Sequence, residues 1–257
     1  MDKTIIEFKR LVEIMDELRL KCPWDKKQTY ETLRHLTIEE TYELAEAIIS
    51  KDSNEIKNEL GDLMLHIVFY SKIGSENNEF DLSDVLKGIN EKLINRHPHI
   101  FGDVVADTDE QVKINWEKIK LKEGTKSVLS GVPASLPSII KAYRIQDKAR
   151  GVGFDWEKPE QVIDKVHEEL AELKEEILKN TNKSKIEGEF GDLLFSLINY
   201  SRFIGVNPDT ALERTNEKFI YRFQYLEDCA KKAGKALSDM TLKEMDVYWN
   251  EAKEKEK

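Results

Sequence analysis

The chain has 257 residues, of which 40% are hydrophobic and 35% are charged, and its formal net charge is −10. A chain this acidic lacks the surplus of Lys and Arg that neutralises phosphates, so we expect no nucleic-acid partner. No segment approaches about 18 consecutive apolar residues, and the first residues lack the apolar core of a signal peptide, which predicts neither a membrane span nor secretion. The two cysteines, Cys22 and Cys229, form no disulfide framework and fit a reducing cytoplasm.

Amphipathic stretches rich in Glu, Lys, Leu, Ile and Ala predict an all-α protein of bundle type, and alternating strand patterns are scarce. In chain order, the predicted helices cover residues 29–50, 54–73, 82–96, 109–122, 138–150, 159–179, 183–204, 208–232 and 241–255. The first two are expected to pair as an antiparallel hairpin. Ser53 is the predicted N-cap of the second helix, and Pro159 and Pro208 fit first-turn positions.

The first half of the sequence reappears in the second half. The matching stretches are 58–72 (NELGDLMLHIVFYSK) with 188–202 (GEFGDLLFSLINYSR), 89–97 (INEKLINRH) with 215–223 (TNEKFIYRF), and 16–25 (DELRLKCPWD) with 147–156 (DKARGVGFDW). A repeat of this length indicates one structural unit present twice. We therefore predict two homologous helical units, residues 1–123 and 137–257. The segment 124–136 between them is rich in Gly, Ser and Pro and is predicted to be a linker.

Each unit carries two pairs of acids at the spacing that places both members on one face of a helix. The pairs are Glu169 with Glu172 and Glu189 with Asp192 in the second unit, and Glu40 with Glu43 and Glu59 with Asp62 in the first. If the helices run antiparallel, four carboxylates converge, and each pair about 5 Å apart repels by ~3 kcal/mol at an effective dielectric of about 20. Divalent cations relieve this repulsion, and an all-oxygen ligand set suits Mg²⁺ or Mn²⁺.

The helix over 183–204 places its acids beside an apolar stripe. At about 100° per residue, Glu189 and Asp192 form a polar stripe together with Ser196 and Asn199. The neighbouring apolar stripe is predicted to face the core, and its members are Phe190, Leu193, Leu194 and Leu197. Gly191, which has no side chain, is predicted to let the preceding helix approach closely. Carboxylates at the border of a buried stripe favour a metal site over a merely solvated face.

Two other interpretations remain open. Glu-rich helices usually present a solvated face, so a non-enzymatic helical scaffold is one alternative. A di-iron carboxylate bundle is the other, and such sites typically use Glu-x-x-His on two helices. This chain has no Glu-x-x-His, and the nearest motif is Asp164-x-x-His167. His66, which takes the place of Ser196 in the first unit, is either a ligand-contacting residue or a packing residue.

These motifs together resemble the MazG family of nucleoside triphosphate pyrophosphohydrolases. The resemblance rests on Glu-Glu-x-x-Glu followed by Glu-x-x-Asp, which occurs twice, and it covers nearly the whole chain. Further stretches typical of the family are CPWD (22–25), RHPHIFGD (96–103) and VGFDW (152–156). The resemblance implies an all-α homodimer that uses Mg²⁺ to split nucleoside triphosphates into monophosphates and pyrophosphate. Broad base specificity and a housekeeping role on the nucleotide pool are expected with it.

The resemblance also implies roles for individual residues. Its implied metal ligands are Glu169, Glu172, Glu189, Asp192, Glu40, Glu43, Glu59 and Asp62. Its implied substrate-binding residues are Lys218, Arg222, Asn199, Trp249, Lys92 and Arg96. Glu168 or Glu172 would accept or orient the proton of a metal-activated water that attacks the α- or β-phosphorus. In some family members the second unit does most of the catalysis, whereas here both units keep their acids, so the sequence leaves the activity of the first unit open.

Overall fold

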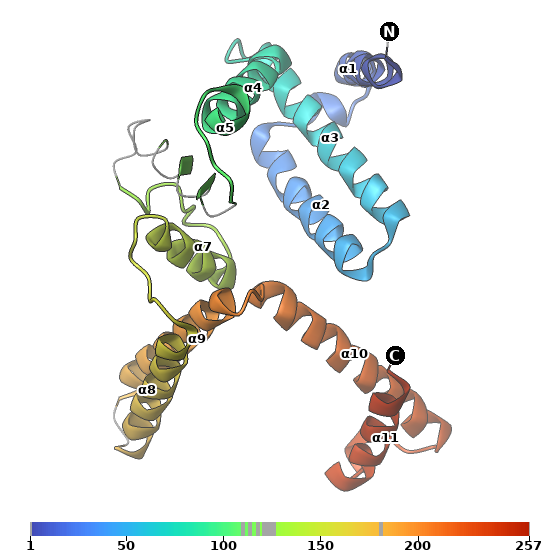
Figure 1. Cartoon of the computed structure of the whole chain (residues 1–257). Coiled ribbons are helices and arrows are strands. Elements are labelled where there is room, and N and C mark those ends of the chain that lie inside the picture. The colour runs from blue at the N-terminus through green and yellow to red at the C-terminus, as the bar shows by residue number, and fades with distance from the viewer. Residues whose placement is uncertain are drawn as a thin grey trace. The chain divides into compact units, whose positions relative to one another are not determined.

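The computed structural model describes residues 2–108, 111, 112, 115, 116, 119, 127–179 and 182–256. The regular elements among these residues are helices, which confirms the all-α prediction (Figure 1). They are α1 (Lys3–Lys21), α2 (Tyr30–Ser50), α3 (Ser53–Glu76), α4 (Leu82–Arg96), α5 (Pro98–Phe101), α7 (Ser138–Arg150), α8 (Pro159–Leu178), α9 (Lys183–Phe203), α10 (Pro208–Lys232) and α11 (Leu242–Lys255). Most of the helix predicted over 109–122 lies outside the described residues. Among the described helices, none has both the length and the apolar character needed to cross a bilayer.

The chain divides into two compact units, Met1–Trp116 and Glu117–Lys257. In the first unit α2 and α3 form a hairpin, and α1 packs on α3 (Figure 1). Their facing sides enclose a core of Met15, Leu33, Val68, Phe69 and Ile73. Fully burying a side chain of this kind contributes about 1.5–3 kcal/mol, so this cluster is the main source of stability for the first unit.

The second unit repeats this arrangement with α8 and α9 as the hairpin and α7 packed on α9. Val162 and Val166 of α8 and Ile198 of α9 are buried between these helices. A second hairpin follows, in which α11 packs against α10. Buried Leu226 and Ala252 belong to this pair of helices.

Capping residues define where the helices begin. The α3 helix is capped by Asp52, whose carboxylate accepts hydrogen bonds from the main-chain N–H of Asn54 and Glu55 at 2.9 and 3.2 Å. The prediction of Ser53 as the N-cap is therefore wrong by one residue, because the Asp before it satisfies the free N–H groups. Pro159 and Pro208 lie in the first turns of α8 and α10, as predicted. Helix α1 has no counterpart among the predicted helices.

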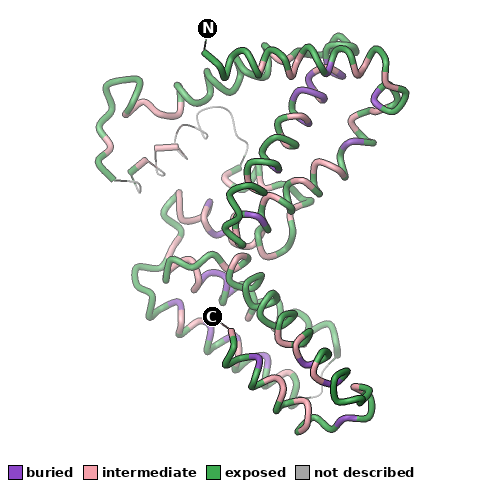
Figure 2. The backbone as a smooth tube through the Cα atoms, turned by 90° about the vertical axis from the view of Figure 1, so that its right-hand side faces the viewer, coloured by how far each residue is buried: buried purple, intermediate pink, exposed green. Residues whose placement is uncertain are grey.

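The prediction for the stripes of α9 is wrong at five positions, because three residues of the apolar stripe are exposed and two of the polar stripe are buried. Phe190, Leu194 and Leu197 are 53%, 46% and 44% exposed, whereas Ser196 and Asn199 are 7% and 4% exposed. Figure 2 shows that buried residues form only short stretches on otherwise exposed helices. The apolar stripe of α9 is thus not a core stripe within the described part of the chain, because the polar stripe is the one that faces α7 and α8. The expectation for Gly191 is also wrong, since a Cβ there would meet no atom within 4 Å.

Candidate functional site

Three carboxylates from α8 and α9 converge in the second unit. One oxygen each of Glu169, Glu172 and Glu189 lies within 4.8 Å of the others. Burial raises the pKa of Glu189, and the negative charges of Glu172, Asp192 and Glu169 raise it further. Asp192, the fourth predicted ligand, is not part of this triplet, but its charge acts on Glu189. The carboxylates thus repel one another, and a bound cation would relieve this repulsion.

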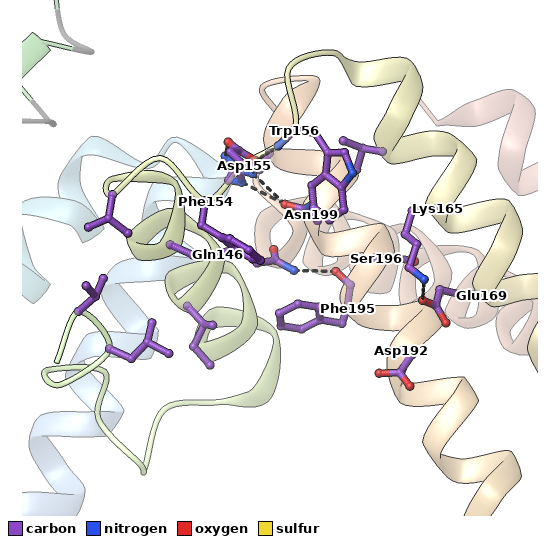
Figure 3. Close-up of a pocket in the computed structure, with 17 residues that line it drawn as sticks. Gln146, Phe154, Asp155, Trp156, Lys165, Glu169, Asp192, Phe195, Ser196 and Asn199 are labelled. Carbon is purple, nitrogen blue, oxygen red and sulfur yellow. Dashed lines mark hydrogen bonds and ion pairs between the residues drawn. The ribbon is translucent and has the colours of Figure 1, made fainter.

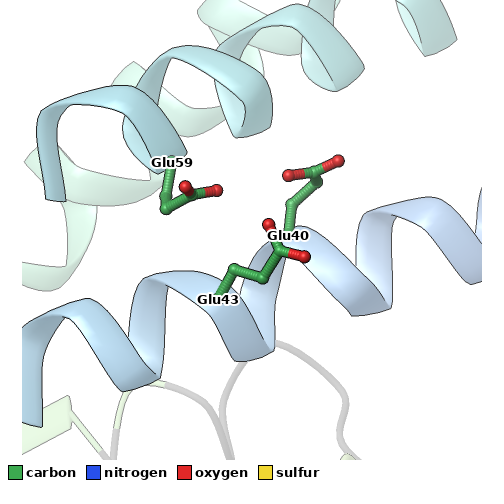
Figure 4. Close-up of side chains that lie close together, drawn as sticks. All are labelled: Glu40, Glu43 and Glu59. Atoms are coloured by element: carbon green, nitrogen blue, oxygen red, sulfur yellow. The ribbon is translucent and has the colours of Figure 1, made fainter. Parts of the chain in front are cut away.

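The first unit contains the matching triplet, Glu40, Glu43 and Glu59, with oxygens again within 4.8 Å of one another. Figure 4 shows Glu59 of α3 facing Glu40 and Glu43 of α2. Glu59 is 8% exposed, and its Oε2 atom is buried without a hydrogen-bond partner in the described part of the chain. Burial is the main cause that raises the pKa of Glu59 and of Glu40, followed by the charge of Glu43 for the former and of Asp62 for the latter.

The chemistry of both triplets fits a hard divalent cation. All donors are carboxylate oxygens, which Mg²⁺ and Mn²⁺ prefer, and neither triplet includes a histidine. The absence of histidine from the triplets does not favour the di-iron alternative, whose sites use Glu-x-x-His. The unpartnered oxygen of Glu59 is a second indication, because a buried carboxylate oxygen normally has a donor or an ion beside it.

Lys165 provides a positive charge beside the second triplet. Its Nζ lies 2.7 Å from an oxygen of Glu169 and 2.9 Å from one of Glu168. Hydrogen bonds to Glu169 and then to Glu168 raise the pKa of Lys165, so it stays protonated. Glu168, a predicted proton acceptor, is therefore held in an ion pair. The matching position in the first unit is Leu36, which has no charge.

A cavity of about 490 Å³ opens beside the second triplet, and Glu169 and Asp192 belong to its wall. Most of its lining is apolar. Figure 3 shows Phe154 and Trp156 on one side of it and Lys165, Glu169 and Asp192 on the other. Val128 and Leu129, from the segment predicted as a linker, also line it. The cavity thus joins an aromatic surface to the carboxylate triplet.

The inner wall of the cavity carries a polar network. Arg202 forms an ion pair with Asp155, in which Nη1 lies 2.7 Å from Oδ2. Its Nε and Nη2 atoms also donate to Oδ1 of Asn199 at 3.3 and 2.9 Å. Gln146 of α7 donates from Nε2 to the main-chain oxygen of Phe195 at 2.8 Å. These contacts hold Asn199 and Gln146 in fixed orientations at the cavity wall.

The other predicted substrate-binding residues lie elsewhere. In the second unit, Arg222 donates to Glu256 at 2.9 Å, and its guanidinium lies 5.6 Å from the ring centroid of Trp249. Lys218 is exposed on α10, one helical turn before Arg222. None of these three residues lines the cavity; of the predicted substrate-binding set in this unit, Asn199 alone does so. The first-unit residues of this set, Lys92 and Arg96, lie on α4.

In the first unit, larger side chains stand at two of the positions that correspond to the cavity wall. Phe69, which is 2% exposed, stands where the second unit has Asn199, and His66 stands where it has Ser196. Thr37 contacts both His66 Nδ1 at 2.7 Å and Tyr70 OH at 2.6 Å. Burial lowers the pKa of His66, although the charge of Asp62 opposes this. His66 is thus buried and held by Thr37 within the first unit.

Several residues of the cavity carry no clear signal in the sequence. No motif points to Gln146, and the family resemblance of VGFDW (152–156) gives its aromatic residues no place in the site. Val128 and Leu129 belong to the segment whose Gly, Ser and Pro content predicts a linker. The only available signal was that the stretch 152–156 precedes the Glu-Glu-x-x-Glu helix, which brings it near the acids once the hairpin forms.

Comparison with known proteins agrees with this arrangement. The sequence profile of the MazG nucleotide pyrophosphohydrolase domain matches residues 28–101 and again residues 157–226. A Thermotoga maritima protein named nucleoside triphosphate pyrophosphohydrolase/pyrophosphatase MazG is 43% identical over 258 residues, which is 98% of each chain. The nucleoside triphosphate pyrophosphohydrolase of Escherichia coli K12 is 39% identical over 96% of this chain and 97% of its own. The uncharacterised protein YabN of Bacillus subtilis is 44% identical over 98% of this chain and 52% of its own.

Proposed function

Because the chain belongs to the MazG nucleotide pyrophosphohydrolase family, we propose that it hydrolyses nucleoside triphosphates to nucleoside monophosphates and pyrophosphate with the help of Mg²⁺. One observation carries the proposal: a cavity with aromatic walls opens directly beside a triplet of glutamates in the second unit. The names of the Thermotoga maritima and Escherichia coli relatives support the same activity.

The cavity suits the nucleoside part of such a substrate. Its volume of about 490 Å³ falls within the range of about 300–1,000 Å³ usual for small-molecule sites. Phe154, Trp156 and Phe195 offer aromatic faces, and every nucleobase can stack on such faces whatever its identity. This lining supports broad base specificity. A nucleoside placed there would direct its phosphates toward Lys165 and the carboxylates (Figure 3).

Glu169, Glu172 and Glu189 would hold Mg²⁺, with Asp192 beside them. Bound there, Mg²⁺ would neutralise phosphate charge and lower the pKa of a water molecule. Glu172 is the exposed member of the triplet and forms no ion pair among the described residues, whereas Glu168 is paired with Lys165. Since Glu168 is held by Lys165, we assign the proton of the attacking water to Glu172, through the carboxylate oxygen that does not face the metal ion.

Lys165 would position the substrate. Its ammonium group lies at the border between the aromatic wall and the triplet, where the phosphate nearest the ribose would pass. When a metal ion engages the oxygens of Glu169, the same ammonium can form a charge-assisted hydrogen bond to a phosphate oxygen. The first unit has Leu36 at this position and Phe69 in place of Asn199. We therefore propose that the second unit is the hydrolase and that the first binds metal without binding a nucleotide.

We also propose a homodimer in the cytoplasm with a housekeeping role on the nucleotide pool. Phe190, Leu194 and Leu197 form an exposed apolar stripe on α9. Soluble single chains rarely expose such a stripe, which supports its being covered by a second copy of the chain. Cys22 and Cys229 are both free thiols, which suits a reducing compartment. Light scattering of the purified chain tests the dimer, and a mass of one chain would contradict it.

The activity itself is tested by product analysis. Each of the four ribonucleoside and four deoxyribonucleoside triphosphates is incubated with the protein and Mg²⁺, and the products are separated by anion exchange. We expect monophosphate and pyrophosphate in equal amounts, and no turnover when EDTA removes the metal. Diphosphate with orthophosphate, or the absence of products from every substrate, would contradict the proposed function.

A further inference from the structure

Gln146 is a buried polar residue that the carboxylate chemistry does not use. It lies on α7, is 7% exposed and lines the cavity of the second unit. Its Nε2 donates a hydrogen bond to the main-chain oxygen of Phe195 at 2.8 Å. Its Oε1 is also buried, and no residue in the described ranges donates a hydrogen bond to it. Buried acceptors without a donor are costly and rare, so this atom indicates a donor that the chain itself does not supply.

The contact with Phe195 fixes which end of the carboxamide is unpartnered. If the group were reversed, its oxygen would face the carbonyl oxygen of Phe195, and two acceptors cannot form a hydrogen bond. The unpartnered end is therefore an acceptor. Figure 3 shows Gln146 near Phe154 on the aromatic side of the cavity, away from Lys165 and Asp192. A ligand group that meets this acceptor belongs to the part of the ligand that lies among the aromatic rings.

The first unit has no such acceptor. The repeat pairs residues 16–25 with 147–156, so the residue that corresponds to Gln146 is Met15. Met15 is 1% exposed and belongs to the apolar core. The first unit packs at this position with the apolar side chain of Met15, so packing does not require the amide of Gln146. Its amide is thus better explained by the cavity, which the second unit has beside it.

We propose that Gln146 determines nucleobase recognition: its Oε1 accepts a hydrogen bond from an N–H group on the pairing edge of the base. This inference rests on the proposed function. Adenine and cytosine carry an exocyclic amino group on that edge, and guanine, uracil and thymine carry a ring N–H. One acceptor therefore suits every common base, so the cavity selects nucleobases as a class and rejects ring systems that have no donor there.

The experiment compares two ligands that differ by one donor. Purine riboside triphosphate is ATP without the 6-amino group, so it has the same rings and no added bulk. In the wild-type protein we expect kcat/KM for ATP to exceed that for purine riboside triphosphate by about tenfold or more, because the latter leaves the acceptor unpaired. In Gln146→Met, which introduces the residue of the first unit, the two substrates are expected to agree within about twofold.

Controls separate this role from a structural one. Gln224→Met makes the same change at an exposed position of α10 and is expected to leave the tenfold preference unchanged. Circular dichroism and the thermal midpoint report whether Gln146→Met folds. The wild-type comparison of the two ligands needs no variant, so equal kcat/KM values in the wild type overturn the inference even if Gln146→Met fails to fold. A preference for ATP that survives Gln146→Met overturns it as well.

A binding measurement keeps this inference distinct from the proposed hydrolysis. Calorimetry with AMP and purine riboside monophosphate measures base recognition without any chemical step. If the wild type releases no pyrophosphate but binds AMP about tenfold more tightly, and Gln146→Met removes the difference, then the role of Gln146 stands while the proposed function fails. Equal affinities, or no binding of either monophosphate, overturn the role of Gln146.

Discussion

The two units of this chain share a triplet of glutamates and differ in what lies beside it. Glu40, Glu43 and Glu59 stand next to a packed core, whereas Glu169, Glu172 and Glu189 stand next to a cavity of about 490 Å³. Large side chains of the first unit correspond to small polar ones of the second, as in Phe69 against Asn199 and His66 against Ser196.

The metal-ligating carboxylates and the cavity beside them therefore depend on different parts of the structure. Duplication copies the helical spacing and the hairpin that together bring the carboxylates close, because both belong to one local pair of helices. The cavity instead depends on the side chains of several elements. We therefore expect that a unit can keep its acids without offering space for a nucleotide. The following predictions test this contrast.

Truncating a core side chain of the first unit should give the largest loss of stability. Phe69→Ala is expected to lower the free energy of unfolding of this unit by about 3–5 kcal/mol, because a fully buried ring leaves a cavity. Chemical denaturation followed by circular dichroism measures the change. Phe101→Ala truncates the same kind of residue at a 61% exposed position and should change stability by less than about 1 kcal/mol. Similar costs for both variants would show that Phe69 is not packed as described.

Filling the cavity of the second unit should remove most of the activity. Asn199→Phe introduces the residue of the first unit, and kcat/KM for ATP is expected to fall about 100-fold because the ring occupies the space for the nucleoside. The rise in thermal midpoint with Mg²⁺ should persist, since the glutamates are unchanged. Asn58→Phe makes the same change at an exposed position of α3 and serves as the control. Full activity of Asn199→Phe would exclude the cavity as the nucleotide site.

Removing one charge from the triplet should stabilise the metal-free protein. The pKa of Glu189 is raised, so between its ordinary value of 4.5 and its raised value the folded state binds more protons than the unfolded state, and stability falls as the pH rises. Above the raised pKa the whole penalty is present. Glu189→Gln is therefore expected to raise the thermal midpoint in EDTA by a few degrees and to abolish the further rise with Mg²⁺. A lower midpoint in EDTA would contradict the repulsion.

His66 should give the stability of the first unit a smaller dependence on pH. Burial lowers its pKa from 6.5, so the folded state binds fewer protons than the unfolded state below that pH, and the first unit loses stability as the pH falls from 7 to 5.5. His66→Asn should flatten this slope, whereas His35→Asn, at an exposed position, should leave it unchanged. The slope of the unfolding free energy against pH is the readout. An unchanged slope in His66→Asn would assign the titration to other groups.

The sequence predicted those features that depend on one helix or one hairpin. The helical period places Glu169 with Glu172 on α8, and the repeat places Glu189 on the neighbouring helix, which is enough to predict a cluster of acids. It also predicted the helices over 29–50 and 54–73, whose counterparts are Tyr30–Ser50 and Ser53–Glu76. Such features need only local geometry and the preference of antiparallel neighbours for short connections.

The remaining features depend on contacts between helices, which the periodicity of a single helix does not predict. Which stripe of α9 faces α7 and α8 is settled by packing, and the prediction chose the apolar stripe where the structure buries Ser196 and Asn199. The cavity arises where α7, α8, α9 and the segment near Val128 meet, so Gln146 gave no signal in the sequence. The roles of Lys218 and Trp249 rest on the family resemblance. Neither residue lines the cavity, and both roles stay predictions.

The most direct test of this account is to neutralise the matching glutamates of the two units separately. Glu172→Gln and Glu43→Gln make the same chemical change at equivalent positions of the repeat, and pyrophosphate release from ATP with Mg²⁺ is measured for both. We expect Glu172→Gln to lower kcat by about 100-fold or more, because it removes a metal ligand and proton acceptor, and Glu43→Gln to retain at least about a third of the activity. Equal losses in both variants, or a larger loss in Glu43→Gln, would contradict the assignment of the reaction to the second unit.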